Sequence, residues 1–230
     1  MVTIFYREQT FVRTRWKWPY TRSQEEETRA MPHTETLFRS APLPGWEEAR
    51  EVAAALVEAA TPRDGYTIDH ALAIAELSRR VGAEFDLSEE VLEALALGAL
   101  LHDLGKLGVP EAVLEKPGPL TQQEWEVVKR HPDIGARMIE QIWCLRRVAQ
   151  MIRHHHERYD GSGYPDELEA EEIPLTARIV AATDAYDVMV RGRPYGESRS
   201  PTEAIEELMD RAGTQFDAEV VAALARVAAP

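Results

Sequence analysis

From residue 45 to the C-terminus, apolar residues recur every three or four positions, and this helical period limits the fold more than any other feature of the sequence. No stretch in this region alternates long enough to predict a strand. Ser88 is a good helix cap, and Thr121 and Ser200 are each followed three residues later by glutamate, the capping-box pattern. The region is therefore predicted to be all-α, an orthogonal helical bundle. Helices are expected over residues 46–60, 67–81, 88–101, from 121, over 134–157 with a break, over 175–191, from 200 and from 217.

Residues 1–44 form a different kind of segment, with seven basic and five acidic side chains and no helical period. Residues 13–18 alternate like a short strand, but Pro19 and three glutamates follow soon after. We expect a short N-terminal arm over residues 1–44 that is disordered or partly β. Residues 45–230 are expected to form one folded domain.

Charge and composition exclude several kinds of protein. The chain has 26 basic and 40 acidic residues, a net charge of −14, which argues against binding a nucleic-acid polymer. Cys144 is the only cysteine, so no disulfide framework and no thiolate metal site is expected. No apolar run approaches the roughly 18 residues of a membrane span, and the N-terminus does not resemble a secretory signal. We expect a soluble, cytoplasmic protein that does not bind membranes.

Several histidines lie on helix faces that are otherwise apolar. His70 begins the series that continues with Ile74 and Val81, and His102 ends the series that contains Leu95. A single such residue is most often a core histidine whose hydrogen bonds are satisfied. The number of such histidines in this chain favours a shared role.

Three consecutive histidines occur at residues 154–156. His155 and His156 lie one helical turn after Met151 and Ile152, so both are expected to continue the buried stripe. His154 follows polar positions and is expected to face water. Two buried neutral imidazoles side by side each need a partner, and a divalent metal would satisfy both. A metal site is therefore one interpretation of this pair.

Carboxylates on inward faces are candidate oxygen ligands for the same metal. Asp103 directly follows a buried histidine, and Asp184 lies on the apolar face of the helix expected over 175–191. The alternative for Asp184 is an inward salt bridge to Arg178 or Lys106. His131 follows the end of a predicted helix, so the alternative for His131 is a cap on a helix C-terminus.

Two longer motifs match a known family. The stretch Leu101-His-Asp-Leu-Gly-Lys106 resembles the HD metal-dependent phosphohydrolases. The stretch His155-His-Glu-Arg-Tyr-Asp-Gly-Ser-Gly-Tyr-Pro165 resembles the signature of their HD-GYP branch. Further matching stretches follow in order from about residue 65 to residue 217. The number and order of these motifs make the resemblance specific.

The resemblance implies a two-metal, sometimes three-metal, non-haem centre in an all-α domain. Members with a third metal carry glutamate where this chain has Tyr66, so two divalent ions are expected, iron or manganese, with zinc or nickel as alternatives. The resemblance assigns Asp103 to bridge the metals, Lys106 and Arg193 to contact the phosphodiester, and Gly163 and Tyr164 to border the guanine pocket. Carried over by position, the metal ligands would be His70, His102, Asp103, His131, His155, His156 and Asp184.

The implied activity is hydrolysis of cyclic di-GMP to linear pGpG, or further to GMP. A hydroxide bridging the two metals would attack phosphorus, with Asp103 and Lys106 as the catalytic residues. The family usually has a basic residue after Arg193-Pro-Tyr195, where this chain has Gly196 and Glu197. Two alternatives therefore stay open: a hydrolase of another cyclic dinucleotide or nucleotide, and a non-catalytic, metal-containing binding module. Besides the cyclic dinucleotide, expected partners are a second copy of the chain or signalling proteins.

Overall fold

A computed structural model describes residues 46–64, 68–192 and 198–228 of the chain, and in 61–64 it describes only the backbone. The predictions for the arm over residues 1–44, and for Tyr66, Arg193, Gly196 and Glu197, concern residues outside these ranges. Within the described ranges no helix combines the length and the apolar composition that a membrane span requires.

The described residues are helical, as predicted, and their only β-type pairings are isolated bridges at Asp160–Glu169 and Ala212–Phe216. In chain order the elements are α2 (Trp46–Asp64), α3 (Ile68–Ala83), α4 (Glu89–Leu101), η1 (Leu104–Gly108), α5 (Glu111–Leu114), α6 (Gln122–Val128), α7 (His131–Glu140), η2 (Arg146–Val148), α8 (Ala149–His154), η3 (Ala170–Glu172), α9 (Leu175–Arg191), α10 (Pro201–Asp210) and α11 (Ala218–Ala228).

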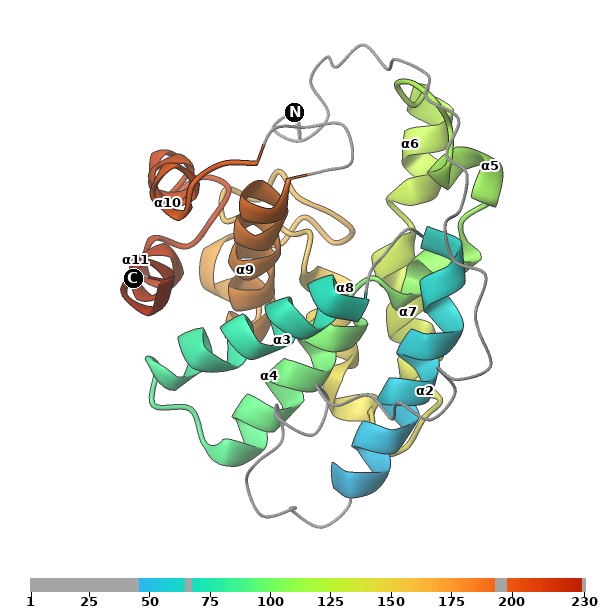
Figure 1. The fold of residues 1–230 in the computed structure, drawn as a ribbon, viewed down its shortest axis with the longest axis horizontal. Helices are drawn as coiled ribbons and strands as arrows, with labels where there is room; N and C mark the ends of the chain where they lie inside the picture. The colour runs from blue at the N-terminus through green and yellow to red at the C-terminus, as the bar shows by residue number, and fades with distance from the viewer. Residues whose placement is uncertain (1–45, 65–67, 193–197, 229–230) are drawn as a thin grey trace, which may run out of the picture.

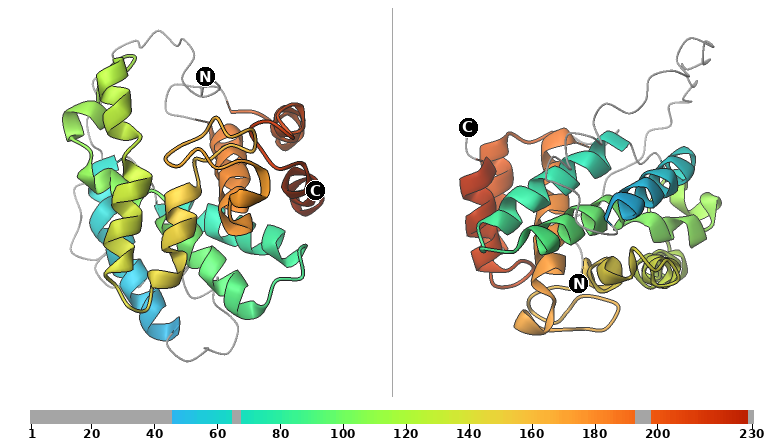
Figure 2. Two further views of the ribbon diagram at one scale, coloured as in Figure 1. Left: turned by 180° about the vertical axis from the view of Figure 1, so that it is seen from behind. Right: turned by 90° about the horizontal axis from the view of Figure 1, so that it is seen from below.

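The helices pack at steep angles around a shared core, and the central pair is α3 and α4 (Figure 1). Helix α9 packs across α3, with α10 and α11 on its outer side, while α2 packs against α4 and η1. The views from behind and from below show α7 and α8 side by side (Figure 2). This arrangement is the orthogonal bundle that the sequence predicts.

The three predicted helix caps are confirmed. Ser88 Oγ accepts a hydrogen bond from the backbone N–H of Val91 at 3.4 Å, and Thr121 and Ser200 each form a complete capping box. Helix α9 has the predicted bounds. These agreements follow from local chemistry, because a cap involves residues that are close in sequence.

The prediction of a helix over 134–157 is wrong in detail. The chain instead forms α7, which begins at His131, then η2, then the short α8, which ends at His154. His131 is therefore the first residue of a helix, and its Nδ1 also lies 2.8 Å from the carbonyl oxygen of Val128, the last residue of α6. The alternative expected for His131, a contact with a helix C-terminus, is thus present together with its place in the site. Arg178 is an alternative partner expected for Asp184. It donates instead to the carbonyl of Ile173 and to the Asp217 carboxylate.

Two buried polar contacts hold the helices that surround the site. Ser78 of α3 and Thr183 of α9 share a hydrogen bond of 2.7 Å in an otherwise apolar interface. Arg50 of α2 donates to the buried carboxylate of Glu93 in α4 at 2.6 Å. Because unpaired polar groups are costly in a core, each contact favours one relative position of its two helices.

Candidate metal centre

The structure brings together all seven side chains that the sequence predicts as metal ligands. They form two neighbouring groups, and within each group one potential ligand atom per residue lies within 4.8 Å of the others. Nε2 of His102 joins the groups, because it lies 3.5 Å from Asp103 Oδ2 and 3.9 Å from Asp184 Oδ1. The first group is Asp103, His131, His155 and His156, and the second is His70, His102 and Asp184.

The ends of helices position five of these seven residues. His102 and Asp103 follow α4 directly, His131 begins α7, and His155 and His156 follow α8. The close approach of η1 to α7 depends on Gly105, where an added Cβ would lie 1.8 Å from the backbone oxygen of His131. A glycine is required at this position for the segment that carries Asp103 to lie against the start of α7.

Three of the buried histidines share the same tautomer. Nδ1 of His102, His131 and His155 lies 2.8, 2.8 and 2.7 Å from the backbone oxygen three residues earlier in the chain. Since a carbonyl oxygen only accepts, Nδ1 carries the hydrogen in each ring. In the neutral form of each ring, Nε2 is then a lone pair available to a metal.

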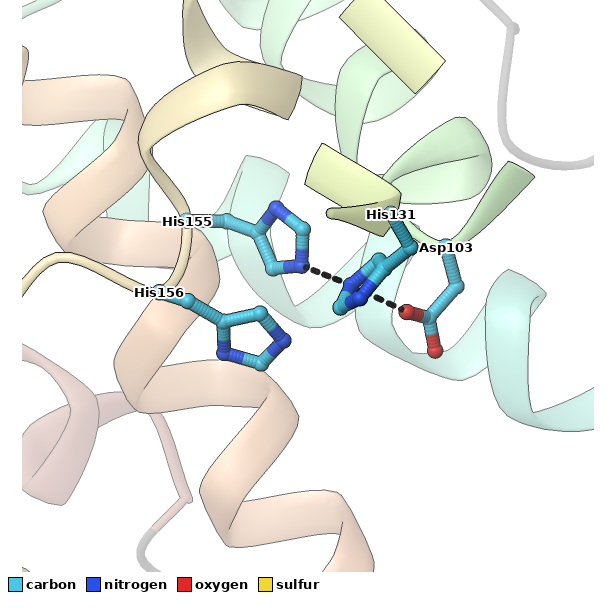
Figure 3. A group of neighbouring side chains, drawn as sticks. All are labelled: Asp103, His131, His155 and His156. Carbon is cyan, nitrogen blue, oxygen red and sulfur yellow. Dashed lines mark hydrogen bonds and ion pairs between the residues drawn. The ribbon is translucent and has the colours of Figure 1, made fainter. Parts of the chain in front are cut away.

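His131 and His155 direct these lone pairs at each other. Their Nε2 atoms are 3.3 Å apart, and His131 Nε2 is also 3.1 Å from Asp103 Oδ1 (Figure 3). The His131 side chain lies between His155 and the carboxylate, and it is only 1% exposed. Two acceptors facing each other in a buried space repel unless a cation or a proton lies between them. This donor set fits a divalent metal.

The electrostatics keep Asp103, His155 and His156 in the form that binds metal. Burial opposes ionisation of Asp103, but the Lys106 ammonium and the neighbouring histidines hold its pKa well below the usual value. Burial, together with the neighbouring rings, lowers the pKa of His155 to about 3, and burial also lowers the pKa of His156. The carboxylate is therefore charged and both imidazoles are neutral near neutral pH.

His70 has a different environment from the other rings. Its Nε2 is 3.5 Å from Asp184 Oδ1, and its Nδ1 is 2.6 Å from Oδ2 of Asp187. Burial lowers the pKa of His70, but the hydrogen bonds and charges of Asp184 and Asp187 outweigh it and raise the pKa to about 9. The sequence reasoning missed Asp187, although a carboxylate one helical turn after Asp184 shares its face of the helix.

Lys106 lies at the open side of the first group. Its Nζ is 2.7 Å from Asp103 Oδ2, and its side chain is 25% exposed. The ammonium group is therefore in direct contact with the Asp103 carboxylate. Its position allows it to reach an anion that approaches the site from solvent.

The loop after α8 adds an aromatic wall to the site. The Tyr164 ring stacks on His156 with 5.0 Å between centroids and an angle of 29°, and Trp125 meets Tyr164 nearly edge-on at 6.4 Å. An added Cβ at Gly163 would lie 2.3 Å from the backbone nitrogen of Arg158, so this close turn requires glycine. Whether Gly163 and Tyr164 contact a substrate stays a prediction.

His154 does not face water, contrary to the expectation from helical phasing. It is 6% exposed, and its Nε2 is 2.9 Å from Oδ2 of Asp166. Helix α8 ends at His154, and the following loop returns over it and covers the ring. His154, Glu157 and Asp166 are also near enough to one another to hold a cation. However, the Arg153 guanidinium already donates to both Asp166 oxygens and supplies the positive charge there.

The chain matches the HD domain family over residues 45–220. It belongs to the HD domain family, and the resemblance to the HD-GYP branch of the metal-dependent phosphohydrolases is confirmed. It is 41% identical over 182 residues to the cyclic di-GMP phosphodiesterase response regulator RpfG of Xanthomonas campestris, covering 78% of this chain and 48% of the relative. A cyclic di-GMP phosphodiesterase of Thermotoga maritima is 39% identical over 167 residues, covering 72% of this chain and 45% of the relative. The chain thus spans about half the length of these curated relatives.

Other similar proteins act on a different dinucleotide. The 3'3'-cGAMP-specific phosphodiesterase 1 of Vibrio cholerae is 34% identical over 161 residues, covering 70% of this chain and 37% of the relative. The crystal structure of the V. cholerae cyclic GMP-AMP phosphodiesterase V-cGAP3 superposes with a TM-score of 0.60 at 22% identity, covering 77% of this chain and 48% of that one. The likeness to this structure concerns the fold alone.

Proposed function

We propose that the chain is a metal-dependent phosphodiesterase that hydrolyses cyclic di-GMP to linear pGpG, with further cleavage to GMP as a slower second step. One observation carries the proposal: seven histidine and aspartate side chains from distant parts of the sequence converge in two adjoining groups. Relatives at 41% and 39% identity are cyclic di-GMP phosphodiesterases, which supports the same substrate here.

The metal centre would use both groups of residues. We propose two divalent ions, iron or manganese, held by His70, His102, Asp103, His131, His155, His156 and Asp184. Asp103 is the proposed bridge, because its two oxygens lie toward different histidines: Oδ1 is 3.1 Å from His131 Nε2, and Oδ2 is 3.5 Å from His102 Nε2. Such a pair of cations supplies positive charge to phosphate oxygens and lowers the pKa of the attacking water.

The chain's own residues would bind and orient the substrate. Lys106, at the open side of the centre, would donate to a non-bridging phosphate oxygen and neutralise the charge that develops there. Tyr164, stacked on His156, would border the guanine nucleotide, and Arg193 would contact the phosphodiester. A local cluster of cations also accounts for how a chain of net charge −14 could admit an anion.

A second candidate substrate is a mixed cyclic dinucleotide. Relatives specific for 3'3'-cGAMP are 34% and 31% identical to this chain. Gly196 and Glu197 stand where the family usually has a cation, which would weaken one phosphate contact. We therefore include this substrate in the test.

The experiment is a hydrolysis assay on purified protein loaded with Fe(II) or Mn(II) under reducing conditions. Cyclic di-GMP, 3'3'-cGAMP and cyclic di-AMP are supplied in turn, and products are separated chromatographically. We expect pGpG from cyclic di-GMP, no product from the double variant His102→Ala/Asp103→Ala, and a loss of about 100-fold or more in kcat for Lys106→Met with metal content retained. Gln150→Ala, an exposed position on α8, is the control.

Each contrary result has a definite meaning. Faster cleavage of 3'3'-cGAMP than of cyclic di-GMP would show that 3'3'-cGAMP is the preferred substrate, and the proposed metal-dependent hydrolysis would still hold. Metal-loaded protein that binds cyclic di-GMP without cleaving it would refute the enzyme and support a non-catalytic binding module.

A further inference from the structure

We propose that Asp187 is a positioning residue that fixes the orientation and tautomer of His70, so that Nε2 of this ring faces the metal centre. The proposal rests on the proposed function, because it assigns a task only if the seven side chains hold metal. Asp187 is not one of the seven proposed metal ligands.

The contact between Asp187 and His70 is short and buried. Oδ2 of Asp187 lies 2.6 Å from Nδ1 of His70, and Asp187 is 8% exposed. The two residues are 117 positions apart and belong to α9 and α3. A carboxylate at this distance accepts from Nδ1–H, which leaves Nε2 as the lone pair.

This carboxylate takes the place of the backbone oxygen used by other rings of the site. His102, His131 and His155 each bond through Nδ1 to the carbonyl three residues earlier, so their own helix or turn orients them. His70 lies in the first turn of α3, and its Nδ1 is instead 2.6 Å from a side-chain oxygen of α9. Asp187 thus supplies from a second helix the kind of acceptor that a backbone carbonyl supplies to the other three rings.

Arg191 holds Asp187 in place. Its Nε lies 2.9 Å from Oδ1 and 2.8 Å from Oδ2 of Asp187, and its Nη2 donates to the backbone oxygen of Asp69 at 3.3 Å. Arg191 therefore connects α9 to the residue that precedes His70. The ion pair also compensates the charge of this mostly buried carboxylate.

Asp187 is therefore expected to affect metal affinity and not only folding. A carboxylate that accepts from the far nitrogen of a metal-bound histidine raises the ligand's basicity and fixes its ring, and its loss typically costs about 10- to 100-fold in metal affinity. Of the two ions, the one held by His70, His102 and Asp184 should be affected.

The test is a Mn(II) titration of the full chain, with free Mn(II) followed by electron paramagnetic resonance. We expect Asp187→Ala to raise the dissociation constant of one of two bound ions by about 10- to 100-fold and to leave the other unchanged. Asp187→Asn keeps a neutral acceptor for Nδ1–H and should lie between Asp187→Ala and wild type. Arg191→Gln keeps the carboxylate but loses the ion pair that holds it, so its affinity should lie between wild type and Asp187→Ala.

Asp217→Asn is the matched control, because Asp217 is also a buried carboxylate paired with an arginine of α9, Arg178, but contacts no ring of the site. In zinc-loaded wild-type protein and in Asp217→Asn, the proton NMR spectrum should contain a far-downfield Nδ1–H resonance that Asp187→Ala lacks.

Two results would overturn the role of Asp187 while leaving the metal centre intact: wild-type affinity in Asp187→Ala, or a loss in Arg191→Gln as large as in Asp187→Ala. Wild-type protein that binds no Mn(II) would instead refute the metal centre itself, and the role of Asp187 with it.

Discussion

Nε2 of His131 faces Nε2 of His155 at 3.3 Å, and the Nδ1 hydrogen of each ring is already committed to a backbone oxygen. A metal between them would remove this repulsion in the folded state only, so metal binding should stabilise the protein. At a free metal concentration of about 100 times the dissociation constant the gain is about 2.7 kcal/mol. For a domain of this size this corresponds to a rise in Tm of roughly 5–10 °C.

Thermal unfolding with Mn(II), and then with an excess of chelator, measures this gain. His131→Gln removes one of the two facing nitrogens and should lose most of the metal-dependent rise. An identical Tm with metal and with chelator in the wild-type protein would contradict the metal centre.

Metal binding should depend on pH through His70. In the metal-free protein the pKa of His70 is about 9, because Asp184 and Asp187 outweigh the effect of burial, so the ring carries a proton at neutral pH. A metal must displace this proton, so its apparent affinity should rise with pH until the pH passes about 9. His155, with a pKa of about 3, releases none in this range.

Calorimetric titrations in buffers of different ionisation enthalpy measure the released protons directly. The raised pKa of His70 has the opposite effect on the stability of the metal-free protein, which falls as the pH rises. The contribution of His70 is complete below pH 6.5 and is lost as the pH rises through about 9. Metal affinity that stays constant from pH 6.5 to 9 would contradict the assigned environment of His70.

The sequence predicted those parts of the fold that depend on local chemistry. The capping boxes at Thr121 and Ser200 and the bounds of α9 are set by residues near in sequence, and they agree with the structure. The burial of His102 and the partial burial of His70 followed from the helical period alone. Motif resemblance then supplied the family, which periodicity could not.

The errors concern contacts between segments that are distant in sequence. Helical phasing predicted that His154 faces water, but a loop that returns from residue 157 onward covers it. The helical period carries no information about the path of a loop. Asp187 was missed for a similar reason, because its importance comes from His70 on another helix. The break before α8 was expected but could not be located, since η2 continues the same apolar pattern.

Gly105 should tolerate no side chain. An alanine Cβ would lie 1.8 Å from the backbone oxygen of His131 and 2.5 Å from the backbone nitrogen of Gly135, and neither atom can rotate away. We expect Gly105→Ala to separate η1 from α7, to cost about 1–3 kcal/mol or more in unfolding free energy, and to weaken metal binding. Urea unfolding and Mn(II) titration measure the two effects.

Gly108→Ala is the control for this substitution, because in the same segment its Cβ would meet only side-chain atoms of Ile134, the nearest at 3.0 Å. Equal losses of stability and metal affinity in both variants would show that the Gly105 contact has no special role in holding Asp103 near His131.

His154→Ala should destabilise the protein without removing its metals. The ring is buried and hydrogen-bonded to Asp166, so its removal leaves a cavity and deprives that carboxylate of one partner. We expect a loss of about 1–3 kcal/mol in unfolding free energy, compared with no more than about 0.5 kcal/mol for the exposed Gln150→Ala one turn earlier. Because the same loop carries Tyr164 against His156, substrate KM should rise while metal content stays at the wild-type level. Loss of metal in His154→Ala would place this ring among the ligands, and unchanged stability would mean that the loop does not cover it in solution.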